Sequence, residues 1–139
     1  MHFNIENSIA LKLSNTLNSL RKAFNKEIKD FGISSEQYAF LKLISIKNLT
    51  PSEIADILNK DKAAITRFII ALEKKDLIKK ENIDKRSYKL ILKEKGRKIL
   101  DKVDKKALEF RKKIEQNIPE EKIGCLFETL GKIEKIMKE

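Results

Sequence analysis

The sequence predicts a mainly α-helical winged helix-turn-helix fold, in the order α-α-α-α-β-β-α-α, with long helices at both ends. Three observations carry this prediction. Only 4 glycines and 2 prolines interrupt the chain, which favours long helices. Two short amphipathic segments, near residues 50–59 and 61–75, have the spacing of a helix-turn-helix. Residues 77–92 then form two β-like runs around a polar turn, as a two-stranded wing does.

The first element is expected to be one helix over residues 5–31, ended by Gly32 in the left-handed conformation. Its apolar side chains recur at steps of three and four residues over seven turns. Such a helix is about 40 Å long, which is more than a small core needs. Part of its apolar stripe is therefore expected to meet another subunit. The stripe consists of Ile5, Ile9, Leu13, Leu17, Leu20, Phe24, Ile28 and Phe31.

Two capping boxes predict where the second and third helices begin. Ser34 pairs with Gln37 at the start of a helix that runs to about Lys47. Thr50 pairs with Glu53, with Pro51 at the first helical position, in a short helix that ends near Asn59. We expect these helices to bury Tyr38, Phe40, Leu41 and Ile44 in one, and Ile54, Ala55, Ile57 and Leu58 in the other.

The fourth helix, residues 62–75, is expected to be capped by Asp61 and to be the recognition helix, the one that enters a groove. Its apolar side chains lie within about 100° on a helical wheel, which predicts one buried face and one open face. The buried face is Ile65, Phe68, Ile69 and Leu72, and the open face is Ala63, Thr66, Arg67, Ile70 and Lys74.

The wing is predicted from strands over residues 77–83 and 87–92, joined by the turn Asp84-Lys85-Arg86. The helical period returns from Glu94, and Asn117-Ile118-Pro119 separates two final helices. A chain of 139 residues is long enough for one domain. We expect a single domain over residues 1–139, in which residues 33–93 form a winged helix-turn-helix lobe between the helices of residues 1–32 and 94–139.

The positive charge is concentrated in the predicted helix-turn-helix and wing. The net charge of the chain is +10. Residues 60–100 hold 14 Lys and Arg against 6 Asp and Glu, a net of +8, whereas the other 98 residues have a net of only +2. A cluster of this kind favours a polyanionic partner, and double-stranded DNA fits the predicted motif.

Several classes of function lack support in the sequence. One cysteine and one histidine, His2, argue against a disulfide framework and a metal centre. No phosphate-binding glycine loop or nucleophile with a nearby base is present, so we expect no enzyme and no cofactor. No apolar run approaches 18 residues, so we expect a soluble, cytoplasmic protein that does not associate with membranes.

The ordered set of short motifs resembles the MarR (multiple antibiotic resistance regulator) family over essentially the whole chain. The motifs are Leu49-Thr50-Pro51-Ser52-Glu53-Ile54-Ala55, Ile65-Thr66-Arg67, Leu72-Glu73-Lys74-Lys75, Leu77-Ile78, Asp84-Lys85-Arg86-Ser87 and Leu92-Lys93-Glu94-Lys95-Gly96. The resemblance implies a homodimeric, ligand-responsive regulator, usually a repressor, that binds a pseudo-palindromic operator and answers a small apolar or phenolic effector. It implies that residues 33–93 are a DNA-binding lobe. It also implies that residues 1–32 and 94–139 are dimerisation helices, so that the first and last helices form the dimer interface.

Three positions depart from the family pattern. Asp76 stands where the family usually has Gly, so the turn there needs a residue that tolerates the left-handed conformation, as Asp does. Lys80 replaces the usual Arg after the first strand, and Lys93 replaces the usual Thr.

Candidate DNA-binding residues lie in the wing turn and on the recognition helix. Arg86 is expected to enter the minor groove, oriented by Asp84 and flanked by Lys85 and Ser87. On the recognition helix the candidates are Lys62, Ala63, Ala64, Thr66 and Arg67, with Arg67 suited to guanine and the alanine methyls to thymine. The alternative for each is an ordinary solvated turn or helix face.

Further lysines are expected to contact phosphates or add to the long-range field, although a solvated surface explains at least half of them. They are Lys60, Lys79, Lys80, Lys85, Lys89 and Lys95. Cys125 is expected to be a buried structural thiol, with an oxidation sensor as the alternative. The alternative for the whole protein is a winged-helix module that binds another protein and does not read DNA, which the apolar Ile70 on the open face favours.

Overall fold

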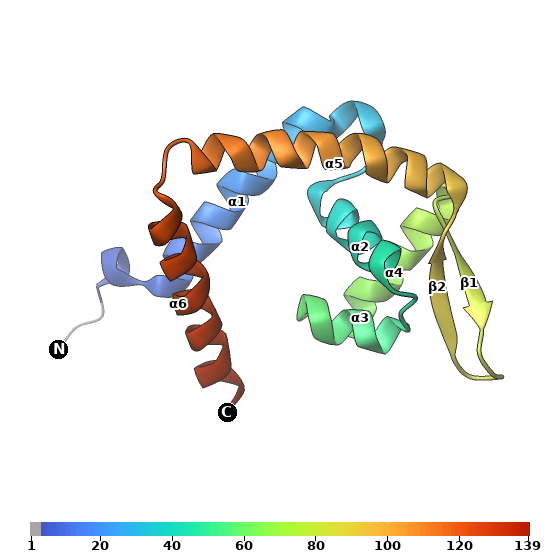
Figure 1. Ribbon diagram of the computed structural model, residues 1–139. Coiled ribbons are helices and arrows are strands. Elements are labelled where there is room, and N and C mark those ends of the chain that lie inside the picture. Colours follow the sequence, from blue (N-terminus) through green and yellow to red (C-terminus); the bar gives the residue numbers. More distant parts are fainter. Residues whose placement is uncertain (1–3) are drawn as a thin grey trace. The chain divides into compact units, whose positions relative to one another are not determined.

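The computed structural model describes residues 4–139, so His2 lies outside the described residues. The chain divides into two compact units, one ending at Asp104 and one from Lys105 to Glu139. The predicted order of four helices, two strands and two helices is confirmed (Figure 1). The elements are η1 Ile5–Asn7, α1 Ile9–Ile28, η2 Lys29–Phe31, α2 Ser35–Ile46, α3 Pro51–Leu58, α4 Lys62–Lys74, β1 Ile78–Asn82, β2 Tyr88–Leu92, α5 Glu94–Glu115 and α6 Glu120–Lys138.

The prediction of one uninterrupted helix over residues 5–31 was wrong at both ends. The Ser8 side chain accepts a hydrogen bond from the Leu11 amide, so it caps α1 and separates it from the short η1. At the other end α1 stops at Ile28, and the tighter turn η2 leads to Gly32. Gly32 has φ 76°, as predicted for a left-handed terminator. The apolar period continues through these turns, which is why the sequence suggested one helix.

The predicted caps of α2, α3 and α4 are confirmed. Both capping boxes close, between Ser34 and Gln37 and between Thr50 and Glu53. Asp61 accepts a hydrogen bond from the Ala64 amide at 2.7 Å and starts α4. Each cap satisfies amide groups that a helix end leaves without a partner, so the three helix starts are fixed by local chemistry.

The core of the first unit forms where α2, α3, α4 and the wing meet. Ile57 was expected to be buried there but is 57% exposed. Ile54, Ala55 and Leu58 span about 100° of the α3 wheel, and Ile57 lies about 60° outside this arc. The fully buried side chains are Ile28, Phe40, Leu41, Ile44, Ile54, Ile65, Ile69, Leu72, Leu77, Leu90 and Val103.

The wing is an antiparallel pair in which Ile78 opposes Leu92 and Asn82 opposes Tyr88. The Leu90 amide also donates to the Leu49 carbonyl at 2.9 Å, so the base of the wing is joined to the chain between α2 and α3. Leu90 is fully buried, whereas the last four residues of β1 are exposed. The wing therefore has a fixed base and an open outer strand.

Polar contacts attach the first half of α5 to α2. The Tyr38 hydroxyl donates to Asp104 Oδ1 at 2.6 Å, and Lys42 Nζ donates to Asp104 Oδ2 at 2.9 Å. Burial of the phenol, followed by its hydrogen bond to Asp104, raises the pKa of Tyr38. Tyr38 is only half-buried, because its hydroxyl reaches this surface carboxylate.

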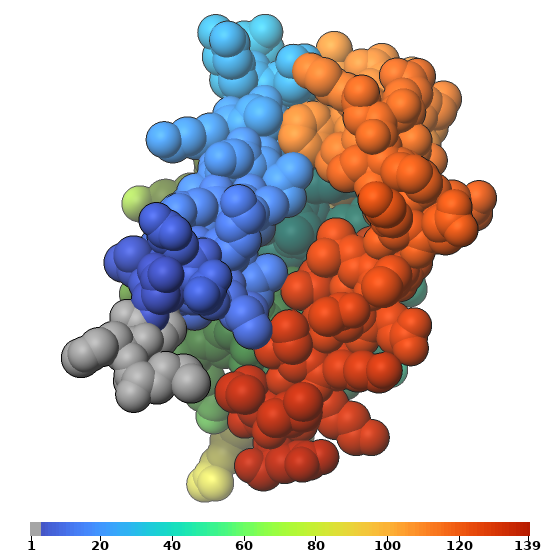
Figure 2. Space-filling model, turned by 90° about the vertical axis from the view of Figure 1, so that its left-hand side faces the viewer, coloured from blue at the N-terminus to red at the C-terminus, as the bar shows by residue number. Residues whose placement is uncertain are grey.

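The terminal helices carry apolar side chains that the chain itself leaves uncovered. On α1 only Phe24 and Ile28 are buried, and the exposed side chains of its first half are visible in Figure 2 in blue. In the second unit α6 has no buried residue, and Phe127 is 59% exposed. The prediction that Cys125 is buried was therefore wrong for the single chain, in which its thiol is exposed on α6. Across residues 4–139, every helix is too short or too polar to cross a membrane.

Candidate nucleic-acid interface

The turn between α3 and α4 sets the direction of the recognition helix. Asn59 ends α3 with φ 53°, and its amide bonds back to the carbonyls of α3. Lys60 and Asp61 follow, and Asp61 caps α4. Asparagine tolerates the left-handed conformation, so this turn forms without a glycine. The result is a three-residue connection that presents the first turn of α4 at the surface of the lobe.

The candidate residues of α4 lie where the sequence placed them. Lys62, Ala63, Thr66 and Arg67 are exposed, and Ala64 is half-buried. The Thr66 hydroxyl donates to the Lys62 carbonyl at 2.9 Å, which leaves its oxygen lone pairs free as acceptors. The open face thus combines two cations, two methyl groups and a hydroxyl acceptor, a set suited to base edges and phosphates.

Ile70 is the apolar exception on this face. Its side chain is 50% exposed, one turn of helix beyond Thr66 and Arg67. An exposed isoleucine makes van der Waals contact but no hydrogen bond. It lies three to four residues further along α4 than the polar side chains of Thr66 and Arg67.

The wing turn is built around the Asp84 carboxylate. Asp84 Oδ1 accepts hydrogen bonds from the backbone amides of Arg86 at 2.8 Å and Ser87 at 2.9 Å. These bonds, that of Arg86 first, lower the pKa of Asp84. Asp84 therefore contacts Arg86 through the Arg86 backbone amide, and within residues 4–139 no hydrogen bond joins the carboxylate to the guanidinium. A carboxylate two residues before an amide reaches that amide more directly than it reaches the end of a long side chain.

The structure therefore leaves the Arg86 and Lys85 side chains exposed at the tip of the wing. Within residues 4–139, neither cation forms an ion pair or a side-chain hydrogen bond. Five guanidinium N–H donors are thus available to an outside acceptor. Ser87 is half-buried at the base of the turn, where its carbonyl accepts from the amides of Ile83 and Asp84.

Lys80 fixes the wing relative to α4. Its ammonium lies 3.7 Å from Glu73 on α4 and 4.9 Å from the centre of the Tyr88 ring on β2. The N-terminal end of α4 and the wing turn lie on the same side of the lobe, away from α5 (Figure 1). The candidate residues of both elements are therefore presented together.

The lysines around this face fall into two groups. Lys60 pairs with Glu36 and lies 5.8 Å from the centre of the Phe68 ring, and Lys80 is engaged as described above. Four others are exposed and form no ion pair within the described part of the chain; they are Lys79, Lys85, Lys89 and Lys95. Sequence spacing gave no signal for this difference, because Glu36 lies 24 residues from Lys60.

Two of the departures from the family pattern compensate for each other. Asp76 has φ 62°, the left-handed conformation expected at this position. Its carboxylate forms an ion pair with Lys93 just before α5. Lys93, and then Lys95, lowers the pKa of Asp76. The pair joins the turn after α4 to the exit of the wing, a contact that sequence analysis missed.

Within residues 4–139, no group of three or more metal-ligating side chains comes together.

Comparison with known proteins supports this arrangement. Residues 33–88 match the family model described as MarR family. A MarR/EmrR family transcriptional regulator from Acinetobacter sp. ADP1 is 26% identical, with a TM-score of 0.87 over 98% of this chain and 99% of that chain. Two further structures share the fold at lower identity. A comparison with curated proteins gave no match.

The first of these is an S. aureus MepR–DNA complex, 19% identical, with a TM-score of 0.85 over 94% of this chain and 98% of that chain. The second is CouR from Rhodococcus jostii RHA1 bound to p-coumaroyl-CoA, 19% identical, with a TM-score of 0.81 over 95% of each chain.

Proposed function

We propose that the protein is a MarR-family, sequence-specific, double-stranded-DNA-binding transcriptional regulator, because residues 33–88 match the MarR family model and contain the helix-turn-helix and the first strand of the wing. The observation that carries the proposal is the joint exposure of the α4 cations and the unpaired Arg86 on one side of the lobe. The first two turns of α4 would enter a major groove, and the wing turn would place Arg86 in the adjacent minor groove. Lys79, Lys85, Lys89 and Lys95 would contact phosphates or attract the duplex.

A homodimer is part of the proposal. Winged helices of this kind read pseudo-palindromes when two copies face adjacent turns of one duplex, about 34 Å apart. The apolar side chains left exposed on α1, and separately those on α6, support self-association, because large exposed apolar patches often mark protein–protein contacts. Bound over a promoter, such a dimer would block transcription, so we propose a repressor. A reporter promoter that carries the bound site should lose expression when the protein is present.

A small apolar or phenolic effector is proposed as the signal. An open pocket of about 280 Å³ lies between α1, α2 and the end of α3, lined by Leu17, Arg21, Ala39 and Leu58 among others. CouR, which shares the fold, was solved with p-coumaroyl-CoA. A ligand here would act by favouring a spacing of the recognition helices that does not fit the groove. Phenolic acids should then release the protein from DNA in a titration, and no effect from a broad panel would count against this role.

Arg86→Ala tests the proposed function at the wing. The duplex would be selected by the wild-type protein from a randomised pool and binding followed by fluorescence anisotropy. We expect a loss of about 1–3 kcal/mol in binding free energy, because the minor-groove contact disappears. Arg97→Ala is the matched control, since Arg97 is also exposed and without an ion pair in the described residues. Equal effects of the two substitutions would remove the wing from DNA reading and leave only a general charge effect.

The second candidate function is a protein-interaction module with no DNA reading, which the 50% exposure of Ile70 on the open face of α4 favours. Salt titration separates the two. A DNA-binding protein loses affinity with a slope near −0.9 per phosphate contact in a plot of log K against log salt. A flat response to salt, together with no preference among duplexes, would support the interaction module.

A further inference from the structure

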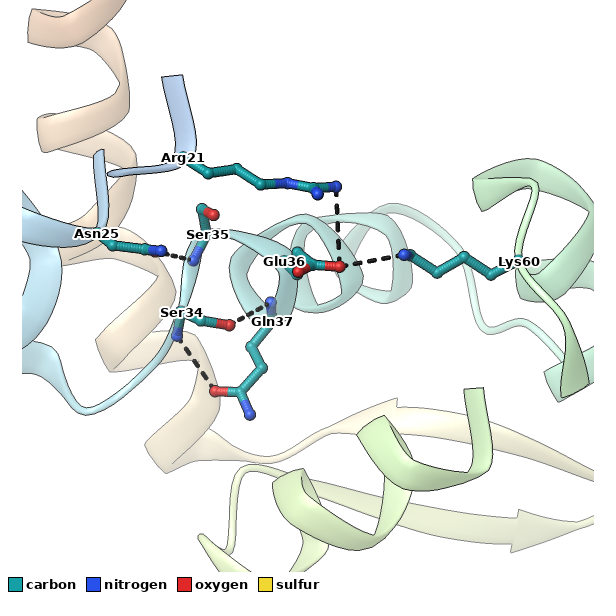
Figure 3. Close-up of polar contacts among 7 residues, drawn as sticks. All are labelled: Arg21, Asn25, Ser34, Ser35, Glu36, Gln37 and Lys60. Atoms are coloured by element: carbon teal, nitrogen blue, oxygen red, sulfur yellow. Dashed lines mark hydrogen bonds and ion pairs between the residues drawn. The ribbon is translucent and has the colours of Figure 1, made fainter. Parts of the chain in front are cut away.

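The first turn of α2 contacts two other segments of the lobe, α1 and the turn before α4 (Figure 3). Glu36 Oε2 accepts a hydrogen bond from Lys60 Nζ at 3.1 Å and lies 3.7 Å from Arg21 Nη2. One carboxylate therefore joins α1, through Arg21, to the turn before α4, through Lys60. Beside it, the Ser35 amide donates to Asn25 Oδ1 at 2.6 Å, a second connection to α1.

The other end of α4 reaches the same turn. Lys75, which caps the C-terminus of α4, donates from Nζ to Gln37 Oε1 at 3.0 Å and to the Gly32 carbonyl. Lys60 immediately precedes Asp61, the residue that caps the N-terminus of α4. Both flanks of the recognition helix are thus held by adjacent residues, Glu36 and Gln37, through two lysines. A rigid helix held at its two ends has little freedom to tilt.

We infer that Glu36 is a positioning residue for DNA reading: it fixes the N-terminal flank of α4 against α2 and connects it, through Arg21, to α1. This inference rests on the proposed function. Glu36 contacts no base or phosphate in this role; it acts through Lys60 on the direction of α4. Gln37 performs the matching task at the C-terminal flank, through Lys75.

The charge and exposure of Glu36 argue for positioning over two simpler roles. An open pocket of about 370 Å³ is shared by Glu36, Lys60, Ala64 and Arg67, so the carboxylate lies close to the face proposed to meet DNA. A negative charge there repels phosphate, which argues against a phosphate contact as its purpose. The side chains of Arg21, Glu36 and Lys60 are 35%, 36% and 30% exposed. Half-exposed ion pairs contribute little to the stability of the fold. Their effect is therefore expected on the direction of α4 relative to α2.

Glu36→Gln tests this role, with Glu27→Gln as the matched control. Glu27 is exposed on α1 and forms no ion pair in the described residues, so both substitutions remove one negative charge. Each variant would be titrated, by anisotropy, with a duplex selected by the wild-type protein and with a scrambled duplex of the same composition. Charge alone predicts slightly tighter binding for both variants. If Glu36 positions α4, Glu36→Gln should instead weaken binding, and it should do so only for the selected duplex.

We expect Glu36→Gln to weaken binding to the selected duplex by about fivefold, with binding to the scrambled duplex unchanged or slightly tighter. The thermal midpoint should stay within about 4 °C of wild type, because the pairs are half-exposed. In a Lys60→Met background, Glu36→Gln should cause little further loss, because its partner is already absent. A simple loss of folded protein would lower binding to both duplexes equally.

The outcomes separate this inference from the proposed function. If wild type shows no preference for any selected duplex, the proposed function fails and the positioning role fails with it. If wild type discriminates but Glu36→Gln binds as Glu27→Gln does, only the positioning role is overturned. Full additivity of Glu36→Gln and Lys60→Met would also overturn it, because the two residues would then act independently.

Discussion

Gly96 sets how closely α5 can approach the turn after the recognition helix. A Cβ at this position would lie 2.3 Å from the Leu77 carbonyl oxygen and 2.7 Å from Leu92 Cδ1. The Leu77 oxygen cannot retreat easily, because it accepts the Lys93 amide at 2.9 Å. Glycine is therefore required here because a Cβ has no room, and not because of its backbone angles.

Gly96→Ala should destabilise the protein by roughly 1–3 kcal/mol, because the wing exit and α5 must move apart. Urea unfolding followed by circular dichroism measures this. Gly131→Ala on α6 is the control, since nothing lies within 4 Å of its added methyl group. The control should be neutral or stabilised by roughly 0.5–1 kcal/mol, because alanine favours helix. Equal stability of the two variants would contradict the close approach.

Asp84 gives the wing turn a dependence on pH whose sign follows from its lowered pKa. The pKa of an aspartate in an unfolded chain is about 3.9. In the folded protein the amides of Arg86 and Ser87 hold the pKa of Asp84 below that value. Its contribution to the ordered turn is complete above the unfolded value and is lost as pH falls through the folded one. Carbon-detected NMR should show Asp84 titrating below the usual aspartate range. The Arg86 and Ser87 amide shifts should follow the same curve in wild type and should lose that transition in Asp84→Asn.

At the scale of elements, local signals account for most of the lobe. The side chains of Ser34, Thr50 and Asp61 bond to amides within three residues, so sequence spacing alone fixes where α2, α3 and α4 begin. The wing follows from the alternation in β2 and the turn chemistry of Asp84. Asp76 was also predictable, because its backbone conformation is a local property.

Other features of the elements depend on tertiary contacts and could not be read from the chain. The choice between one long helix and α1 with two short turns was decided by Ser8 and by the geometry at Ile28, against an uninterrupted apolar period. Ile57 fits a buried stripe by residue type, yet its angle on α3 points it outward. The ion-pair partner of Lys60, Glu36, comes from α2, far away in the sequence, so this ion pair could not be predicted.

The cap of α3 offers a test at the scale of one element. Thr50 accepts from the Glu53 amide at 3.2 Å, and Glu53 returns a bond to the Thr50 amide at 3.0 Å. Thr50→Ala should cost about 1 kcal/mol of stability in urea unfolding, because both bonds of the box are weakened. Ser52→Ala, two residues later and exposed, lacks this role and should change stability by less than about 0.5 kcal/mol. A Thr50→Ala variant as stable as Ser52→Ala would show that packing, and not the cap, holds α3.

At the scale of the whole molecule, charge and apolar surface are divided between different elements. The cations gather on the helix-turn-helix and wing, while the uncovered apolar side chains lie on α1 and α6. This division fits the proposal of two surfaces with separate partners, the duplex for one and a second copy of the chain for the other. The proposed dimer would also cover Cys125 and Phe127, which are exposed in the single chain.

We propose above all that two copies of this chain bind one duplex through their recognition helices and wings. Sedimentation velocity of the protein mixed with a selected duplex, at a series of salt concentrations, tests it most directly. We expect two chains per duplex at moderate salt. As salt rises, the logarithm of the binding constant should fall linearly with the logarithm of the salt concentration, with a slope of about −0.9 for each phosphate contact. A complex with one chain per duplex, or no complex with any double-stranded sequence at moderate salt, would contradict it.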